Sequence, residues 1–161
     1  MTAKLRLGLA LYQPDIAQNV GTTLRTGACF GVPVHIIHPC GFAFSGKALR
    51  RSGMDYLDHV SVIEHDDWDA FAGWVRAGGR RLVLLSARGG VAHVDFAFAP
   101  GDIVLLGRES AGVPATVHEA VDARLRIPLR PGMRSLNVAV AGAMVLGEAL
   151  RQTSGFPLIE G

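Results

Sequence analysis

Two short segments of the chain, Leu82–Leu85 and Ile103–Leu106, are apolar at every position instead of alternating with polar residues. A strand with one face in water alternates, so an unbroken apolar run of this length indicates a strand covered on both faces. Helical patterns lie between such runs, and strands that alternate with helices favour a parallel sheet. We therefore predict an α/β fold, with a parallel sheet flanked by helices on both sides.

The same pattern extends along the whole chain of 161 residues. No linker or low-complexity stretch interrupts it, and this length is sufficient for one buried core, so we predict a single domain over residues 1–161. The expected strands are Leu5–Tyr12, Val34–Ile37, Val60–Glu64, Leu82–Ser86, Ile103–Gly107 and Leu125–Ile127, and the expected helices cover residues 18–30, 46–52, 67–77, 115–120 and 135–152.

Composition excludes several classes of protein. Apolar residues make up 49% of the chain and charged residues 19%, which argues against disorder. No apolar run approaches the roughly 20 residues that span a bilayer, so we expect no membrane segment. The two cysteines, Cys29 and Cys40, offer no disulfide framework. We therefore expect a reducing, cytoplasmic environment.

Charge is distributed unevenly, although the formal net charge is only +2. Residues 54–69 carry six acidic side chains and no Lys or Arg, whereas the stretch between Asp122 and Glu148 carries four arginines and no acid. A local basic face is what a polyanion such as RNA requires. An ordinary solvated surface explains the same pattern, so charge alone leaves both interpretations open.

The common signatures of nucleotide and metal sites are missing. Ser45-Gly46-Lys47-Ala48 lacks the remainder of a phosphate-binding loop, and Gln13-Pro14-Asp15 follows the first strand where a dinucleotide fold would have a glycine-rich turn. His35 and His38 stand three apart on an expected strand, which directs them to opposite faces of the sheet. We therefore expect structural or surface histidines and no metal.

Three segments after expected strands carry the polar residues, and ligands of such sheets gather at the carboxyl ends of the strands. The first runs from Asn19 to Arg25 and opens a helix; Asn19 could simply cap that helix, and Thr22, Arg25 and Cys29 should share one exposed face. The second, around Glu109, begins at Gly107, whose missing side chain lets the backbone approach a ligand.

The third segment, residues 127–139, passes through a Pro/Gly loop to a helix that Ser135 could cap. That helix is apolar nearly all round and rich in Ala and Gly, so it must be buried. The polar side chain of Asn137 at its beginning then needs a partner.

Together the three segments resemble the SPOUT-class RNA methyltransferases, in particular the TrmH-like 2′-O-ribose group. The resemblance covers nearly the entire chain and is carried by Asn19-x-Gly21-x-x-x-Arg25, Gly107-x-Glu109-x-x-Gly112-Val113 and Ser135-Leu136-Asn137-Val138, in the family's order. Further segments resemble the family's small subgroup that methylates the wobble nucleotide of transfer RNA: Leu11–Ile16, residues 35–42 and Leu49–Tyr56.

This resemblance implies a SPOUT-type domain with a C-terminal trefoil knot, a homodimer, S-adenosylmethionine as methyl donor and transfer RNA as substrate, methylated on the ribose of cytidine or uridine 34. It also implies three sets of residues. Those matching the catalytic positions are Arg25, Asn19, Glu109, Ser135 and Asn137; those matching the cofactor contacts are Leu85, Gly107, Ile127, Leu129 and Ser135. We expect Arg50, Arg51, Arg130 and Arg134 to hold RNA phosphates.

The role of Arg25 needs physical qualification. The family often assigns the matching arginine as general base, but a guanidinium with a pKa above about 12 is a poor proton acceptor. Binding the flanking phosphate and stabilising developing alkoxide charge suit it better. Three alternatives stay open: methylation of another transfer or ribosomal RNA site, a non-catalytic RNA-binding module on the same scaffold, and an α/β enzyme that uses a different nucleotide.

Overall fold

The computed structural model describes residues 5–51 and 56–160, except for the side chains of Ala48, Arg50 and Arg51. Within these residues it forms one seven-stranded sheet in the order β3-β2-β1-β6-β4-β7-β5, and every neighbouring pair is parallel. This confirms the predicted α/β class. The strands are β1 (Gly8–Tyr12), β2 (Val34–Ile37), β3 (Val62–His65), β4 (Leu82–Leu85), β5 (Val91–Ala92), β6 (Ile103–Leu106) and β7 (Ala123–Arg126).

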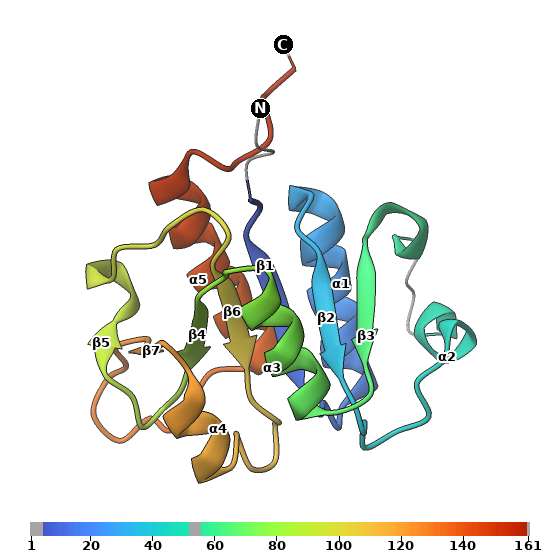
Figure 1. Ribbon diagram of the computed structural model, residues 1–161, viewed down its shortest axis with the longest axis horizontal. Helices are drawn as coiled ribbons and strands as arrows, with labels where there is room; N and C mark the ends of the chain where they lie inside the picture. The colour runs from blue at the N-terminus through green and yellow to red at the C-terminus, as the bar shows by residue number, and fades with distance from the viewer. Residues whose placement is uncertain (1–4, 52–55, 161) are drawn as a thin grey trace.

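Helices cover both faces of the sheet, as predicted. Figure 1 shows α1 and α5 together on one face of the sheet and α3 on the other. The loops that follow the strands lie together at the carboxyl ends of the strands. None of the helices in the described residues is long and apolar enough to span a membrane. The α-helices are α1 (Ala17–Phe30), α2 (Gly46–Arg51), α3 (Trp68–Ala77), α4 (Ala115–Ala120) and α5 (Val138–Thr153), and two short 3-10 helices are η1 (Leu57–His59) and η2 (His93–Asp95).

Successive residues of each strand serve two separate cores. On β1, Leu9 and Leu11 pack in the cluster that contains the buried residues of α1 and α5. Ala10 and Tyr12 pack in the cluster of α3 and α4 on the other face. Because both faces are covered in this way, every residue of β1 and β6 is buried. The unbroken apolar runs in the sequence have this cause.

The predicted boundaries were wrong by three residues at the first strand, which begins at Gly8, and at the last helix, which begins at Val138; further differences lie toward the sheet edge. The two-residue strand β5 was not predicted, because it is too short to show a pattern and exists only through pairing with β7. Strand β7 begins at Ala123, two residues before the predicted start. Its early part was missed because it contains Arg124, whose guanidinium turns back to donate to the carbonyl oxygens of His118 (2.6 Å) and Glu119 (3.1 Å).

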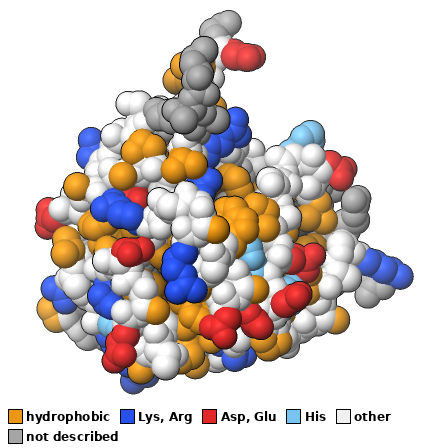
Figure 2. Space-filling model, in the orientation of Figure 1, with side chains coloured by type: hydrophobic (Ala, Val, Ile, Leu, Met, Phe, Trp, Pro, Cys, Tyr) orange, Lys and Arg blue, Asp and Glu red, His pale blue; other side chains and the backbone are white. Residues whose placement is uncertain are grey.

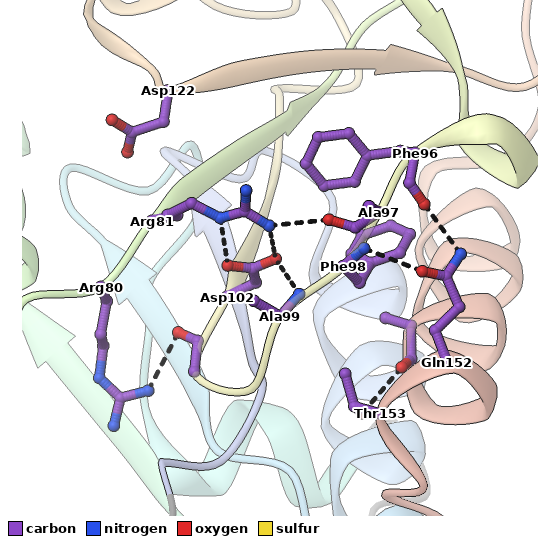
Figure 3. Close-up of polar contacts among 12 residues, drawn as sticks. Arg80, Arg81, Phe96, Ala97, Phe98, Ala99, Asp102, Asp122, Gln152 and Thr153 are labelled. Carbon is purple, nitrogen blue, oxygen red and sulfur yellow. Dashed lines mark hydrogen bonds and ion pairs between the residues drawn. The ribbon is translucent and has the colours of Figure 1, made fainter.

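A polar cluster at the amino ends of the strands fastens the segment between η2 and β6 (Figure 3). The Arg81 guanidinium donates to both carboxylate oxygens of Asp102, at 2.9 and 2.7 Å, and Asp102 is only 1% exposed. On the other side, Gln152 of α5 accepts from the Phe98 amide at 2.9 Å and donates to the Phe96 carbonyl at 2.8 Å. The segment is therefore tied to β4 and α5 together, which fixes the start of β6 between β1 and β4.

Candidate functional site

A cleft of about 990 Å³ lies at the carboxyl ends of the three neighbouring strands β4, β6 and β7. This is where ligands of open α/β sheets bind, and the volume suits a nucleoside-sized molecule. The lining comes from the strand ends, the loops that follow them and the beginning of α5. It includes all five residues predicted to contact the cofactor: Leu85, Gly107, Ile127, Leu129 and Ser135.

One wall of the cleft is apolar and open to solvent. Leu129 is 38% exposed and Met133 67% exposed, and both line the cleft. Exposed apolar side chains in a concave surface mark a place for a ligand with an apolar or aromatic face. The donor and acceptor groups of the strand-end backbone lie beside them, so the cleft can take a flat heterocycle such as adenine.

Gly107 is required by the close approach of the backbone at the end of β6. A Cβ atom on Gly107 would lie 2.8 Å from the Cα atom of Gly112. The loop closes there through two backbone hydrogen bonds between Arg108 and Gly112, at 2.9 and 2.8 Å. This tight loop turns Glu109 toward the cleft, which it lines.

A chain of hydrogen bonds joins the three predicted motifs beside the cleft. Asn137 Nδ2 donates to Asn19 Oδ1 at 3.0 Å, and Asn19 Nδ2 donates to Glu109 Oε1 at 3.3 Å. The other carboxylate oxygen of Glu109 accepts from the Asp15 amide at 3.1 Å. Residues that stand 90 and 118 positions apart in the sequence therefore meet at one point. The partner that Asn137 was expected to need is Asn19.

The two predicted helix caps were wrong. Helix α5 is capped by Asn137, whose Oδ1 accepts from the amides of Ala139 (2.9 Å) and Val140 (3.2 Å), while Ser135 stands before it in the loop, exposed and lining the cleft. Helix α1 has Ile16 at its N-cap and no side-chain cap. Asn19 lies inside the helix, where its side chain is free to bond Glu109 and Asn137.

Asp15 forms an acidic pair with Glu109 that sequence reasoning missed. Burial, followed by the hydrogen bond with Asp15, raises the pKa of Glu109 above its usual value. Hydrogen bonds with Glu109 and then with Ser110 lower the pKa of Asp15, and the Ser110 hydroxyl donates to Asp15 Oδ2. An Arg108 guanidinium nitrogen lies 3.7 Å from the same oxygen. The one available signal was the position of Asp15 in a loop after the first strand.

Arg25 lies outside the residues that line the cleft. It stands on the exposed face of α1 with Thr22 and Cys29, as predicted. Its guanidinium carbon lies 4.6 Å from the centre of the Tyr56 ring, and its Nη2 donates to the Tyr56 hydroxyl at 3.3 Å. The structure therefore brings together Asn19, Glu109, Ser135 and Asn137 but places Arg25 apart from them.

The predicted RNA-binding arginines fall into two groups. Arg130 and Arg134 are exposed in the loop between β7 and α5, and Arg134 also lines the cleft. Arg50 and Arg51 lie on α2, and their side chains are outside the described residues. Three cleft arginines were not selected from the sequence: Arg88, Arg108 and Arg126.

Acidic side chains are exposed at the beginning of α3, on the other side of the sheet from α1 and α5. Asp66, Asp67 and Asp69 are exposed at the beginning of α3, and Figure 2 shows acidic side chains gathered around that part of the surface.

Three of the histidines, His35, His38 and His65, have partners within the protein. His35 Nδ1 and His65 Nε2 are 2.9 Å apart beneath α3, and burial lowers the pKa of His35 to about 4. His38 Nε2 lies 2.8 Å from a Glu64 carboxylate oxygen. In the described ranges 5–51 and 56–160, no group of three or more His, Cys, Asp or Glu side chains is arranged to hold a metal ion.

Comparison with known proteins agrees with this geometry. Residues 6–147 match the SpoU rRNA Methylase family. A relative from Ancylobacter novellus, named tRNA (cytidine(34)-2'-O)-methyltransferase, is 62% identical over 152 residues, which cover 94% of this chain and 96% of the relative. One solved structure, described as giving insights into the 2-OH methylation of C/U34 on tRNA, is 42% identical with a TM-score of 0.87 and covers 94% of this chain and 98% of its own.

A second solved structure shows a relative with a ligand. It is the SpoU methyltransferase AviRb from Streptomyces viridochromogenes in complex with the cofactor AdoMet, 25% identical with a TM-score of 0.83, and the match covers 94% of this chain and 59% of that one. The matched family spans most of the chain, its solved members share the parallel sheet, and the three motifs meet at one cleft. The chain belongs to the SpoU family of SPOUT-class RNA methyltransferases.

Proposed function

We propose that this protein transfers a methyl group from S-adenosylmethionine to the ribose 2′-hydroxyl of nucleotide 34 in transfer RNA. The observation that carries the proposal is the Asn137–Asn19–Glu109 chain at the mouth of the cleft, in a protein 62% identical to a relative named for that reaction. A cytoplasmic location, where transfer RNA is found, is part of the proposal.

The residues of the cleft fit the cofactor. The apolar side chains of Leu85, Ile127 and Leu129 would enclose the adenine ring, and Gly107 would line the same cleft at the end of β6. When bound there, S-adenosylmethionine supplies a methyl group on a positively charged sulfur. Glu109 at the rim adds negative character that suits a cationic ligand.

The hydrogen-bonded side chains of Asn137, Asn19 and Glu109 would orient the ribose that accepts the methyl group. The Nδ2 of Asn137 donates to the Oδ1 of Asn19. The Asn19 amide is thereby oriented with its Nδ2 toward Glu109. Glu109 is thereby held in one rotamer at the cleft. Holding the hydroxyl and the methyl carbon in line is the main contribution that such residues make, and it can be worth roughly 7–11 kcal/mol in the best cases.

Arg25 would reach the reacting nucleotide from a second protomer. It lies six residues beyond Asn19 on α1, about 9 Å along the helix axis, outside its own cleft. The exposed faces of α1 and α5 lie on the same side of the sheet, and α5 exposes Val140 (49%) and Met144 (44%) there. A homodimer across these helices would bury them and bring Arg25 of one protomer toward the cleft of the other. There it would bind phosphate and stabilise alkoxide charge.

Mixing two inactive variants tests this shared site. Arg25→Ala protomers combined with Asn137→Ala protomers give mixed dimers, in which one cleft receives an intact Arg25 and an intact Asn137. At an equal ratio, activity should return to about one quarter of the parent. No recovery after verified exchange of subunits would place Arg25 in the cleft of its own chain.

The Arg25→Ala variant by itself should lose methyl transfer while keeping its affinity for S-adenosylmethionine. Removing a charged contact to the transition state typically costs on the order of a hundredfold or more in turnover. Single-turnover methylation and calorimetric titration of the cofactor measure the two effects separately. Turnover within about tenfold of the parent would refute an essential role.

The substrate is tested by deleting the gene and mapping ribose methylation on total transfer RNA. We expect loss of the mark at a pyrimidine in position 34. An anticodon loop presents unstacked single-stranded bases that a small domain can bind without a separate RNA-binding module. Loss of a mark elsewhere, with position 34 intact, would keep the chemistry and change the substrate. Absence of cofactor binding would instead favour a non-catalytic RNA-binding module.

A further inference from the structure

Tyr56 contacts Arg25, although the two residues are 31 positions apart in the sequence. Tyr56 directly precedes η1, and its half-buried ring packs against the core cluster beneath α1 and α5. That packing fixes the plane of the ring. The Arg25 guanidinium carbon sits 4.6 Å from the ring centre, within the range of a cation–π contact, and its Nη2 donates to the ring hydroxyl at 3.3 Å.

This arrangement holds a charged side chain without neutralising it. An arginine on an exposed helix face samples many rotamers, and ordering it costs side-chain entropy. An aromatic ring attracts the flat face of the guanidinium, and the N–H groups that do not bond the Tyr56 hydroxyl remain available to an anion. A carboxylate partner would instead compete with phosphate for the same N–H groups.

We propose that Tyr56 is the positioning residue for Arg25 in methyl transfer: its ring and hydroxyl hold the guanidinium in the orientation that meets the substrate. This inference rests on the proposed function. It assigns to Tyr56 no contact with the cofactor or the ribose, so its effect is exerted through Arg25.

Two substitutions distinguish the effect of the aromatic face of Tyr56 from the effect of its apolar packing against the core. Tyr56→Phe keeps the aromatic face and removes the hydroxyl, whereas Tyr56→Leu keeps apolar bulk against the core and removes the aromatic face. We expect Tyr56→Phe to retain kcat within about threefold and Tyr56→Leu to lose about tenfold, with unchanged affinity for S-adenosylmethionine in both. Phe30→Leu is the matched control, because Phe30, the last residue of α1, packs against the same core. Its kcat should equal that of the parent.

A spectroscopic signature reports the geometry without any turnover. A guanidinium over a ring experiences its magnetic shielding, so the Nε–H proton of Arg25 should be shifted upfield in the parent and in Tyr56→Phe. In Tyr56→Leu it should return to the value of a solvated arginine, and in Phe30→Leu it should stay shifted. Assignment is direct, because the signal disappears in Arg25→Lys.

The inference is overturned if the parent shows no upfield shift, if Tyr56→Leu keeps kcat within twofold, or if Phe30→Leu loses as much activity as Tyr56→Leu. Each of these results can occur while the parent methylates transfer RNA normally, so the inference then fails alone. A parent that methylates no transfer RNA refutes the proposed function itself, and the role of Tyr56 falls with it.

Discussion

Asn137 uses the two ends of its side chain for two different purposes. Its oxygen caps α5 by accepting from the amides of Ala139 and Val140, and its nitrogen donates to Asn19. One residue therefore contributes both to the stability of a helix and to the orientation of the polar chain at the cleft. The two contributions can be separated, because an aspartate keeps the capping oxygen and lacks the donor.

We predict that Asn137→Asp keeps the thermal stability of the parent and loses activity, whereas Asn137→Ala loses both. Asp is as good an N-cap as Asn, and removing the cap costs about 1 kcal/mol. Without the Nδ2 donor, the Asn19 amide is free to flip and release Glu109. Thermal unfolding and single-turnover methylation on the same samples measure the two effects. Full activity in Asn137→Asp would show that the bond to Asn19 is dispensable.

Stability should fall in mild acid because of the buried pair His35 and His65. Burial lowers the pKa of His35 from 6.5 to about 4, with the nearby charges of His65 and Arg80 adding to the effect. Between these two values the unfolded chain binds a proton that folded His35 does not. The free energy of unfolding therefore decreases as pH falls from about 6.5 to about 4, by on the order of 3 kcal/mol from this group.

His35→Gln should flatten this pH dependence, because glutamine cannot titrate while it can still bond His65. Urea unfolding at several pH values between 4 and 7 measures the slope. His59→Gln removes an exposed histidine and serves as the control. Equal slopes for the parent and His35→Gln would show that His35 is not the titrating group.

At the scale of the elements, replacing two helical glycines by alanine should change the stability of the protein in opposite directions. A Cβ on Gly27 of α1 would lie 2.6 Å from the Val32 carbonyl oxygen and 2.7 Å from Val34 Cγ2, whereas a Cβ on Gly73 of α3 meets nothing within 4 Å. We expect Gly27→Ala to destabilise by about 1–3 kcal/mol, because backbone must move. Gly73→Ala should stabilise by up to about 1 kcal/mol through helix propensity. Denaturant midpoints compare the pair, and equal midpoints would contradict the close approach at Gly27.

The elements that could be predicted are those that leave a recognisable pattern in their own short stretch of sequence. The strands β4 and β6 were placed within a residue because burial on both faces leaves an unbroken apolar run. The cap of α5 was assigned to Ser135 in place of Asn137, because both residue types form caps and only the loop path distinguishes them. Asp15 was missed because its partner Glu109 stands 94 positions away, and only the parallel pairing of β1 and β6 brings the two loops together.

At the scale of the whole molecule, we expect the proposed dimer to dissociate when one charge is placed in its interface. Met144→Glu places a carboxylate on the exposed apolar face of α5 and should shift the protein from dimer to monomer at micromolar concentration. Val91→Glu alters an exposed apolar residue on β5 at the sheet edge and should leave the dimer intact. Analytical ultracentrifugation distinguishes the species, and a monomeric parent would refute the proposed assembly.

The strand order also constrains how the chain can be synthesised. Strand β1 finds its neighbour β2 within about 25 residues, but its other neighbour β6 lies some 95 residues downstream. While the chain leaves the ribosome, β1, β2 and β3 can pair in succession, yet one edge of β1 stays open until residue 106 has emerged. Closing so long a loop is slow, and an open apolar edge invites pairing with other nascent chains. Production of this protein should therefore be more sensitive to the rate of translation than its final stability suggests.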